Sequence, residues 1–162
     1  MSVYQNPMYY KGPQLERKTR RAYDGQTWQA GQFGRCTDSG VVKCKSNATS
    51  IQFLFAKTQP TATSSSDVLV DMIPSAQTQF IIACTAASAD TKALAAYIGS
   101  NEGLAVNGSI CTLSTGNDSN EILHVEDILS NVEGFNNDTS DVPGFVIASV
   151  TAAALTAEGS GL

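Results

Sequence analysis

Short apolar runs separated by turn residues recur along most of this chain, and they constrain its fold more than any other feature of the sequence. From Trp28 onward the sequence predicts about nine short strands, with turn residues recurring between them. The predicted strands are Gln32–Cys36, Val41–Lys45, Ile51–Ala56, Val68–Ile73, Gln79–Ala86, Gly103–Val106, Ile110–Ser114, Ile122–Leu129 and Phe145–Val150. This spacing predicts an all-β fold, a small β-barrel or β-sandwich with at most one short helix.

The third of these strands has the clearest alternation of side chains. Ile51, Phe53 and Phe55 occupy one face, and Gln52 and Ala56 occupy the other. A period of two is typical of a strand that buries one face and exposes the other. We therefore expect a half-buried strand here.

One segment has the pattern of a short helix. Thr91–Ile98 follows Asp90, a good N-cap, and precedes Gly99, which suits a helix C-terminus. Because a helix of this length is marginal, a strand at the same place remains an alternative.

The chain divides into three predicted parts. We expect an extended basic N-terminal arm over residues 1–27, a β-rich domain over residues 28–150 and a flexible C-terminal tail over residues 151–162. Within the domain, residues 58–67 (TQPTATSSSD) are the most loop-like stretch. Their composition predicts a flexible projection or a linker between two halves of a barrel.

The arm combines apolar and basic side chains. Its prolines and its lack of an apolar period predict an extended chain, and its tyrosines and methionine indicate that it lies on a partner. The candidate partner contacts in the arm are Tyr4, Met8, Tyr9, Tyr10, Arg17, Lys18, Arg20 and Arg21. Nucleic acid is the competing ligand for the basic cluster, but no helix-turn-helix, zinc-finger or RNA-binding motif accompanies it.

Charge is divided unevenly along the chain. The net charge of −5 consists of +4 in residues 1–35, +2 in residues 36–57 and −11 in residues 58–162. A basic end on an acidic body predicts docking onto an acidic surface. Charged residues make up only 15%, which argues against a coiled coil and against charge-driven disorder.

No apolar run approaches the roughly 18 residues of a membrane helix, so no membrane partner is expected. The first residues, MSVYQNPMYYKGPQ, lack the basic-then-apolar order of a signal peptide. We therefore expect synthesis in the cytoplasm without export.

The four cysteines have no C-x-x-C spacing, so we predict reduced thiols rather than a metal site. Cys36 and Cys44 flank the turn at Asp38-Ser39-Gly40 and could face each other across a hairpin. A two-residue turn at Ser39-Gly40 would instead pair Cys36 with Lys43.

The sequence shows no constellation of catalytic residues. His124 is the single histidine, and the chain has no G-x-S-x-G or phosphate-binding glycine loop. We therefore expect no enzyme activity and no cofactor. Calcium binding by Asp118 with Glu121, or by Asp138 with Asp141, is the alternative to plain solvated turns.

Trp28 has two possible roles. It follows the Gly25-Gln26 turn and precedes Gly31, so it either caps the barrel or anchors a partner, and we include it among the candidate contacts. Carbohydrate binding through Trp28 and the arm tyrosines is the alternative function, on a β-sandwich module.

The order of segments resembles tailed-bacteriophage head decoration (capsid cement) proteins over roughly residues 28–150. The segments that carry the resemblance are WQAGQFGR (28–35) with the following VVKC, Val68–Pro74, Tyr97-Ile98-Gly99, Gly103–Val106, Ser119–Ile128 and Gly144-Phe145-Val146. The resemblance implies a structural virion protein on the capsid exterior, made in the host cytoplasm. It also implies the major capsid protein as partner and a homo-oligomer, with a trimer favoured. It transfers no catalytic or binding residue.

Overall fold

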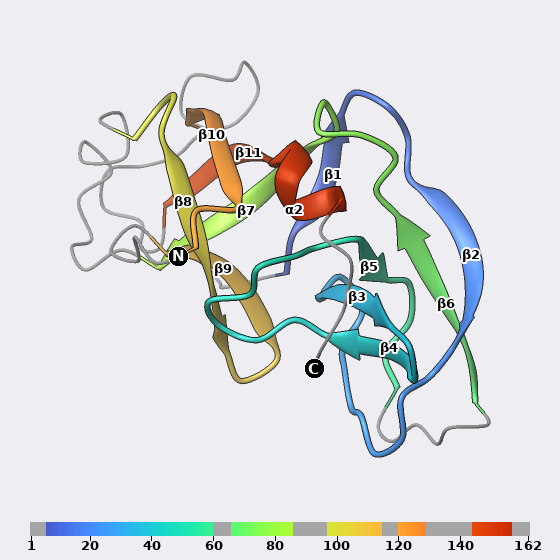
Figure 1. Cartoon of the computed structure of the whole chain (residues 1–162). Helices are drawn as coiled ribbons and strands as arrows, with labels where there is room; N and C mark the ends of the chain where they lie inside the picture. The colour runs from blue at the N-terminus through green and yellow to red at the C-terminus, as the bar shows by residue number, and fades with distance from the viewer. Residues whose placement is uncertain (1–5, 60–65, 86–96, 115–119, 129–143, 157–162) are drawn as a thin grey trace.

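The computed structural model describes residues 6–59, 66–85, 97–114, 120–128 and 144–156. Within these residues it has eleven strands and one short helix, which confirms the predicted all-β fold. The strands form two sheets (Figure 1).

The larger sheet closes into a barrel. Its strands are β1 (Met8–Lys11), β7 (Gln79–Thr85), β11 (Phe145–Val150), β10 (Leu123–Ile128), β8 (Asn101–Asn107) and β9 (Ile110–Ser114), in that spatial order. Because β9 also pairs in parallel with the end of β7, five of these strands form a closed ring. Strand β1 is added antiparallel along the first half of β7. We call these six strands the larger barrel.

The second sheet curls on itself as well. Its strands are β2 (Glu16–Arg21), β6 (Asp67–Met72), β5 (Phe53–Phe55), β3 (Phe33–Thr37) and β4 (Gly40–Lys43), in that spatial order. A bridge between Ala22 and Val41 joins the two outer strands. Gly40 permits this closure: its φ is 135°, and a Cβ there would meet the backbone of Ala22 at 2.6 Å. We call these five strands the smaller barrel.

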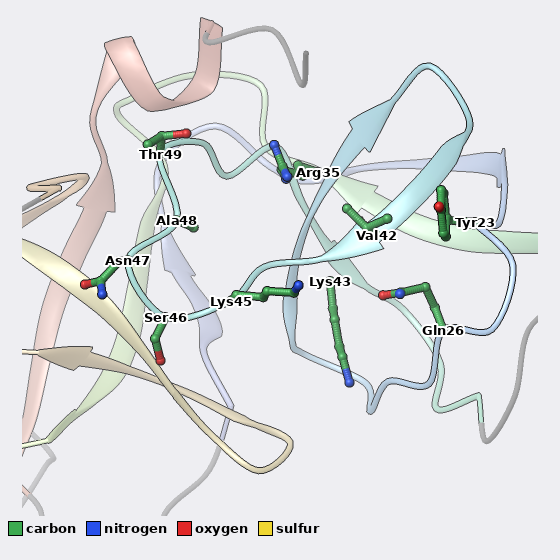
Figure 2. Close-up of a pocket in the computed structure, with 10 residues that line it drawn as sticks. All are labelled: Tyr23, Gln26, Arg35, Val42, Lys43, Lys45, Ser46, Asn47, Ala48 and Thr49. Carbon is green, nitrogen blue, oxygen red and sulfur yellow. The ribbon is translucent and has the colours of Figure 1, made fainter. Parts of the chain in front are cut away.

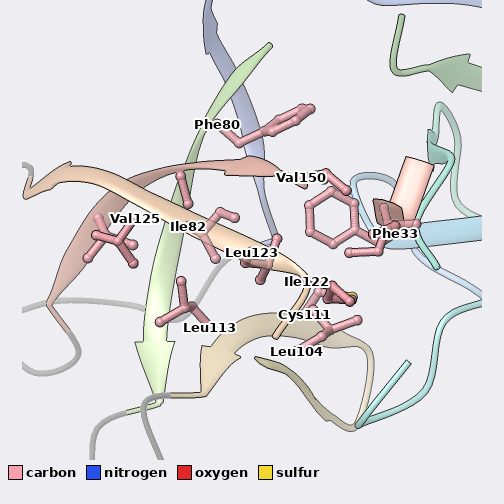
Figure 3. Close-up of a cluster of buried hydrophobic side chains, with 14 of the residues drawn as sticks. Phe33, Phe80, Ile82, Leu104, Cys111, Leu113, Ile122, Leu123, Val125 and Val150 are labelled. Carbon is pink, nitrogen blue, oxygen red and sulfur yellow. The ribbon is translucent and has the colours of Figure 1, made fainter. Parts of the chain in front are cut away.

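The two barrels share a hydrophobic core (Figure 3). The largest cluster of buried side chains contains Phe80 and Leu113 from the larger barrel together with Phe33 and Leu54 from the smaller one. The rings of Phe33 and Phe80 meet edge to face, with centroids 5.7 Å apart. Phe53 and Phe55 instead fill a separate core inside the smaller barrel.

Strand β5 is buried on both faces, so the prediction of a half-buried strand is wrong. Phe53 and Phe55 point into the smaller barrel, whereas Leu54 belongs to the shared core. Ile51 lies in the shared core too, not on the face of Phe53. The reason is that β5 lies where the two barrels meet, and one alternating strand supplies side chains to both cores.

The hairpin of β3 and β4 has a turn different from both expected ones. Thr37 pairs with Gly40 and Cys36 with Val41, which leaves Asp38 and Ser39 as the turn residues. Cys36 therefore faces neither Cys44 nor Lys43.

Residues 8–21, expected as part of an extended arm, include two extended strands that pair with the chain's own sheets. Met8–Lys11 is strand β1, paired with β7, and Glu16–Arg21 is strand β2, paired with β6 over six residues. The next residue, Ala22, is fully buried in the smaller barrel. Backbone hydrogen bonds, which side-chain periodicity does not reveal, fix this segment onto its own chain.

The predicted tail is likewise structured over its first residues. Ala152–Thr156 forms the short helix α2, in which Ala154 is buried. The backbone N–H of Ile51 donates to the carbonyl of Ala154 at 3.3 Å, so α2 is joined to the chain leading into β5. The possible helix over Thr91–Ile98 and the loop over residues 58–67 lie largely outside the described residues.

Candidate partner-binding surface

Strand β1 presents two large apolar side chains to solvent. Met8 is 46% exposed and Tyr9 is 37% exposed. Tyr10 instead packs on the outer face of the larger barrel, against the small cluster formed around Ile81 and Ile147. Tyr4 lies outside the described residues.

Strand β2 holds the basic cluster. It pairs with β6 on one side, and its neighbour on the other side, β4, is reached through the bridge at Ala22. The side chains of β2 are largely exposed. An exposed edge strand rich in cations resists pairing with another sheet, which is one structural reason for the cluster.

The four cations of β2 differ in their surroundings. Arg17 forms a two-point ion pair with Asp71, with nitrogen–oxygen distances of 3.0 and 3.3 Å. Its hydrogen bond to the Asp71 carboxylate, with the attraction between the two charges, raises the pKa of Arg17. Arg21 lies opposite Asp67 in the ladder, whereas Lys18 and Arg20 lie opposite Val70 and Val68. Lys18 and Arg20 are therefore the cations with no acidic residue directly across the ladder.

Of the two roles that the sequence left open for Trp28, the structure shows the first, a residue that caps a barrel. It is 4% exposed and stacks on Phe55, with ring centroids 4.4 Å apart. Its Nε1 donates to the carbonyl of Lys57 at 2.9 Å. Trp28 thus caps the interior of the smaller barrel, and the prediction that it contacts a partner is wrong because its ring is covered.

The neighbours of His124 do not form a catalytic triad. His124 pairs with Ser149 across β10 and β11, but the Ser149 hydroxyl donates to the Glu126 carboxylate at 3.0 Å. Nδ1 of His124 lies 2.7 Å from Oδ1 of Asn101. In a triad the imidazole must lie between the hydroxyl and the carboxylate, and here it does not.

Over the described part of the chain, no group of three or more His, Cys, Asp or Glu side chains gathers as a metal site would require. Of the proposed calcium ligands, Glu121 is exposed, while Asp118, Asp138 and Asp141 lie outside the described residues.

A basic cavity lies beside β3 and β4 and was not predicted from the sequence (Figure 2). It has a volume of about 410 Å³. Its lining residues are Tyr23, Gln26, Arg35, Val42, Lys43, Lys45, Ser46, Asn47, Ala48 and Thr49. The net charge of +2 in residues 36–57 was the feature of the sequence that could have indicated a basic site here. The register of the hairpin and the path of the following loop decide that Arg35, Lys43 and Lys45 line one cavity.

The comparisons with known proteins give no relative: no family model matches the chain, and no match was found among curated proteins or solved structures. In the residues that the structure describes, none of the helices has the length and apolar character needed to cross a membrane.

Proposed function

We propose that this protein is a structural virion protein that binds the outside of a phage capsid and stabilises it. The observation that carries the proposal is the placement of four residues on the consecutive strands β1 and β2: Met8, Tyr9 and Lys18 are exposed, and Arg20 is half-buried. Together β1 and β2 offer a partner apolar area and positive charge.

The two kinds of side chain contribute differently to binding. Burying Met8 and Tyr9 would supply free energy in proportion to the apolar area removed from water. The cations of β2 would steer the protein toward an acidic surface of the major capsid protein and fix its orientation. A homotrimer would multiply these modest contacts through avidity. In this proposal the protein turns over no substrate and holds no cofactor.

The alternative function, a carbohydrate-binding module, was predicted to use Trp28 together with the tyrosines of the N-terminal segment. The Trp28 ring stacks on Phe55 and is nearly covered, so it offers no stacking face to a sugar. No other contact among the described residues favours this alternative.

The test measures occupancy on purified heads that lack the protein. We expect Met8→Ser with Tyr9→Ser to weaken binding at least tenfold, because two apolar contacts of about 1 kcal/mol or more each are lost. We expect Lys18→Glu to weaken binding at low salt and to have a smaller effect at high salt, where charges are screened. Lys57→Glu is the matched control, because this exposed lysine lies on neither strand.

Thermal melting and light scattering accompany each variant, so that a folding or assembly defect is recognised. If the folded Met8→Ser/Tyr9→Ser and Lys18→Glu proteins occupy heads as fully as the Lys57→Glu control, binding through β1 and β2 is disproved. Deletion of residues 1–24 is not a suitable test, because it removes β2 and the buried Ala22.

A further inference from the structure

We propose that the basic cavity beside β3 and β4 binds a carboxylate-rich segment of a partner protein. This inference goes beyond the proposed function, because it concerns neither β1 nor β2 and is tested without capsids.

The cavity gathers positive charge without compensation. Arg35 of β3, Lys43 of β4 and Lys45 of the following loop all line it, and its lining contains no carboxylate. None of these three cations forms an ion pair with another described residue. Carboxylates are the protein groups that match such a set, since hydrogen bonds between ionised partners are about twice as strong as neutral ones.

The wall of the cavity is held in place by the larger barrel. The Ser46 hydroxyl accepts from the backbone N–H of Val106 at 2.8 Å, and the N–H of Asn47 donates to the Leu104 carbonyl at 3.0 Å. The side chain of Asn120 donates to the carbonyl of Asn47 at 2.8 Å. A site whose loop is already ordered loses less conformational entropy on binding.

The rest of the lining favours a peptide over a bare inorganic anion. Val42 and Ala48 contribute apolar surface, while Tyr23, Gln26 and Ser46 contribute polar side chains. A glutamate-rich peptide, whose side chains carry a carboxylate on an apolar methylene stem, uses both kinds of contact. A nucleic acid strand instead requires a track of cations along its backbone and aromatic platforms for its bases, and this cavity has three cations at one place.

Lys43 lines a second cavity as well as the basic one. A neighbouring cavity of about 210 Å³ is lined by Lys43 and Gln32. Gln32 is fully buried, and its Nε2 has no hydrogen-bond partner in the structure. A buried donor without an acceptor is costly, but this nitrogen is closed off from solvent, so a ligand in the basic cavity would contact Lys43 rather than Gln32.

The experiment titrates acetyl-hexaglutamate amide into the isotope-labelled full chain and follows the backbone amide resonances. We expect saturable one-to-one binding, with the largest shifts at residues 42–49. Lys43→Ala and Lys45→Ala should each weaken binding about fivefold, the loss expected for one partly exposed ion pair. Lys57→Ala removes the same charge outside the cavity and should leave the affinity unchanged.

Two further arms define what would overturn the proposal. It is wrong if Lys57→Ala weakens binding as much as Lys45→Ala, since attraction to overall charge would then explain the titration. It is also wrong if inorganic phosphate or a twelve-nucleotide DNA strand produces the same shifts with higher affinity. The Met8→Ser/Tyr9→Ser protein should bind hexaglutamate normally, so failure of capsid binding and failure of this site are separable.

Discussion

At the scale of single residues, burial decides the chemistry of the cysteines. All four are free, and Cys44, Cys84 and Cys111 are buried while Cys36 is partly exposed. Burial, reinforced by the charge of Glu102, raises the pKa of Cys84 to about 12. Burial also raises the pKa of Cys111 to about 11, against the opposing influence of the Phe33 backbone and of Lys43. Thiolates react and thiols do not, so these buried groups are chemically inert.

Alkylation should therefore distinguish the thiols. We expect iodoacetamide at pH 8 to modify Cys36 in the native protein and to leave the three buried cysteines untouched until denaturant is added. Intact-mass spectrometry of the native sample counts the adducts, and peptide mapping locates them. Two or more rapid adducts on the folded chain would contradict the burial described here.

The same groups make stability depend on alkaline pH. Because the folded pKa lies above the ordinary value of 9.0, the folded state retains a proton that the unfolded state releases. The stabilisation is complete below pH 9 and is lost as pH rises toward about 11 to 12, at up to roughly 1.4 kcal/mol per pH unit for each thiol. Urea titrations across this range should show a shallower decline for Cys84→Ala than for the unaltered protein.

Gly34 is another residue whose surroundings decide what is tolerated. A Cβ at this buried position would collide with the ring of Phe53 and would lie 2.9 Å from Cε2 of Phe55. We expect Gly34→Ala to lower the free energy of unfolding by about 1 to 3 kcal/mol through overpacking. In a Phe53→Leu background, Gly34→Ala should lower the free energy of unfolding by less. Equal decreases in both backgrounds would disprove the collision with the Phe53 ring.

At the scale of elements, strands β1 and β2 show the limit of side-chain periodicity. The nine predicted strands each coincide with an observed one because their apolar residues face a core. MYYK and ERKTRR show no buried face in the sequence, yet both are strands. Most side chains of these two strands lie in water, and backbone hydrogen bonds to β7 and β6 hold the strands in place. Such hydrogen bonds leave no alternation of apolar residues in the sequence.

Removing the N-terminal segment should therefore damage the fold. Deletion of residues 1–24 takes away β2, the ion pair of Arg17 with Asp71, and Ala22, which closes the smaller barrel. We expect a lower melting temperature and greater susceptibility to proteolysis. The triple substitution Arg17→Ala/Lys18→Ala/Arg20→Ala retains the backbone ladder and should melt within a few degrees of the unaltered protein. Similar losses in both variants would mean that the cations, not the strand, provide the stability.

At the scale of the whole molecule, charge is divided between residues 16–72 and residues 73–162 of the sequence. Residues 16–72, which build the smaller barrel, carry eight basic and five acidic groups. Residues 73–162 contain every strand of the larger barrel except β1. They carry one basic and ten acidic groups. The cations of the basic cavity and of strand β2 all come from the smaller barrel or the loop that follows β4, so the acidic partners that we propose would meet this part of the molecule.

The shared core makes the two barrels one folding unit. Phe33 is fully buried and belongs to the smaller barrel by pairing, but to the core of the larger barrel by packing. We expect a single calorimetric transition for the whole chain. Phe33→Ala should lower the free energy of unfolding by about 3 to 5 kcal/mol and still give one transition, whereas two separated transitions would show independent domains.

The sequence alone determined the strand class of most segments, because alternation and turn residues act locally and require no knowledge of the partner strand. Met8 and Tyr9, which the sequence names as candidate partner contacts, are solvent-exposed in the structure, and their contact with a partner stays a prediction. The tertiary structure alone decided which strands close each barrel, that β5 is buried on both faces and that Trp28 is covered. It also brought Arg35, Lys43 and Lys45 to one cavity, because long-range register and inter-barrel packing depend on contacts that sequence neighbours do not encode.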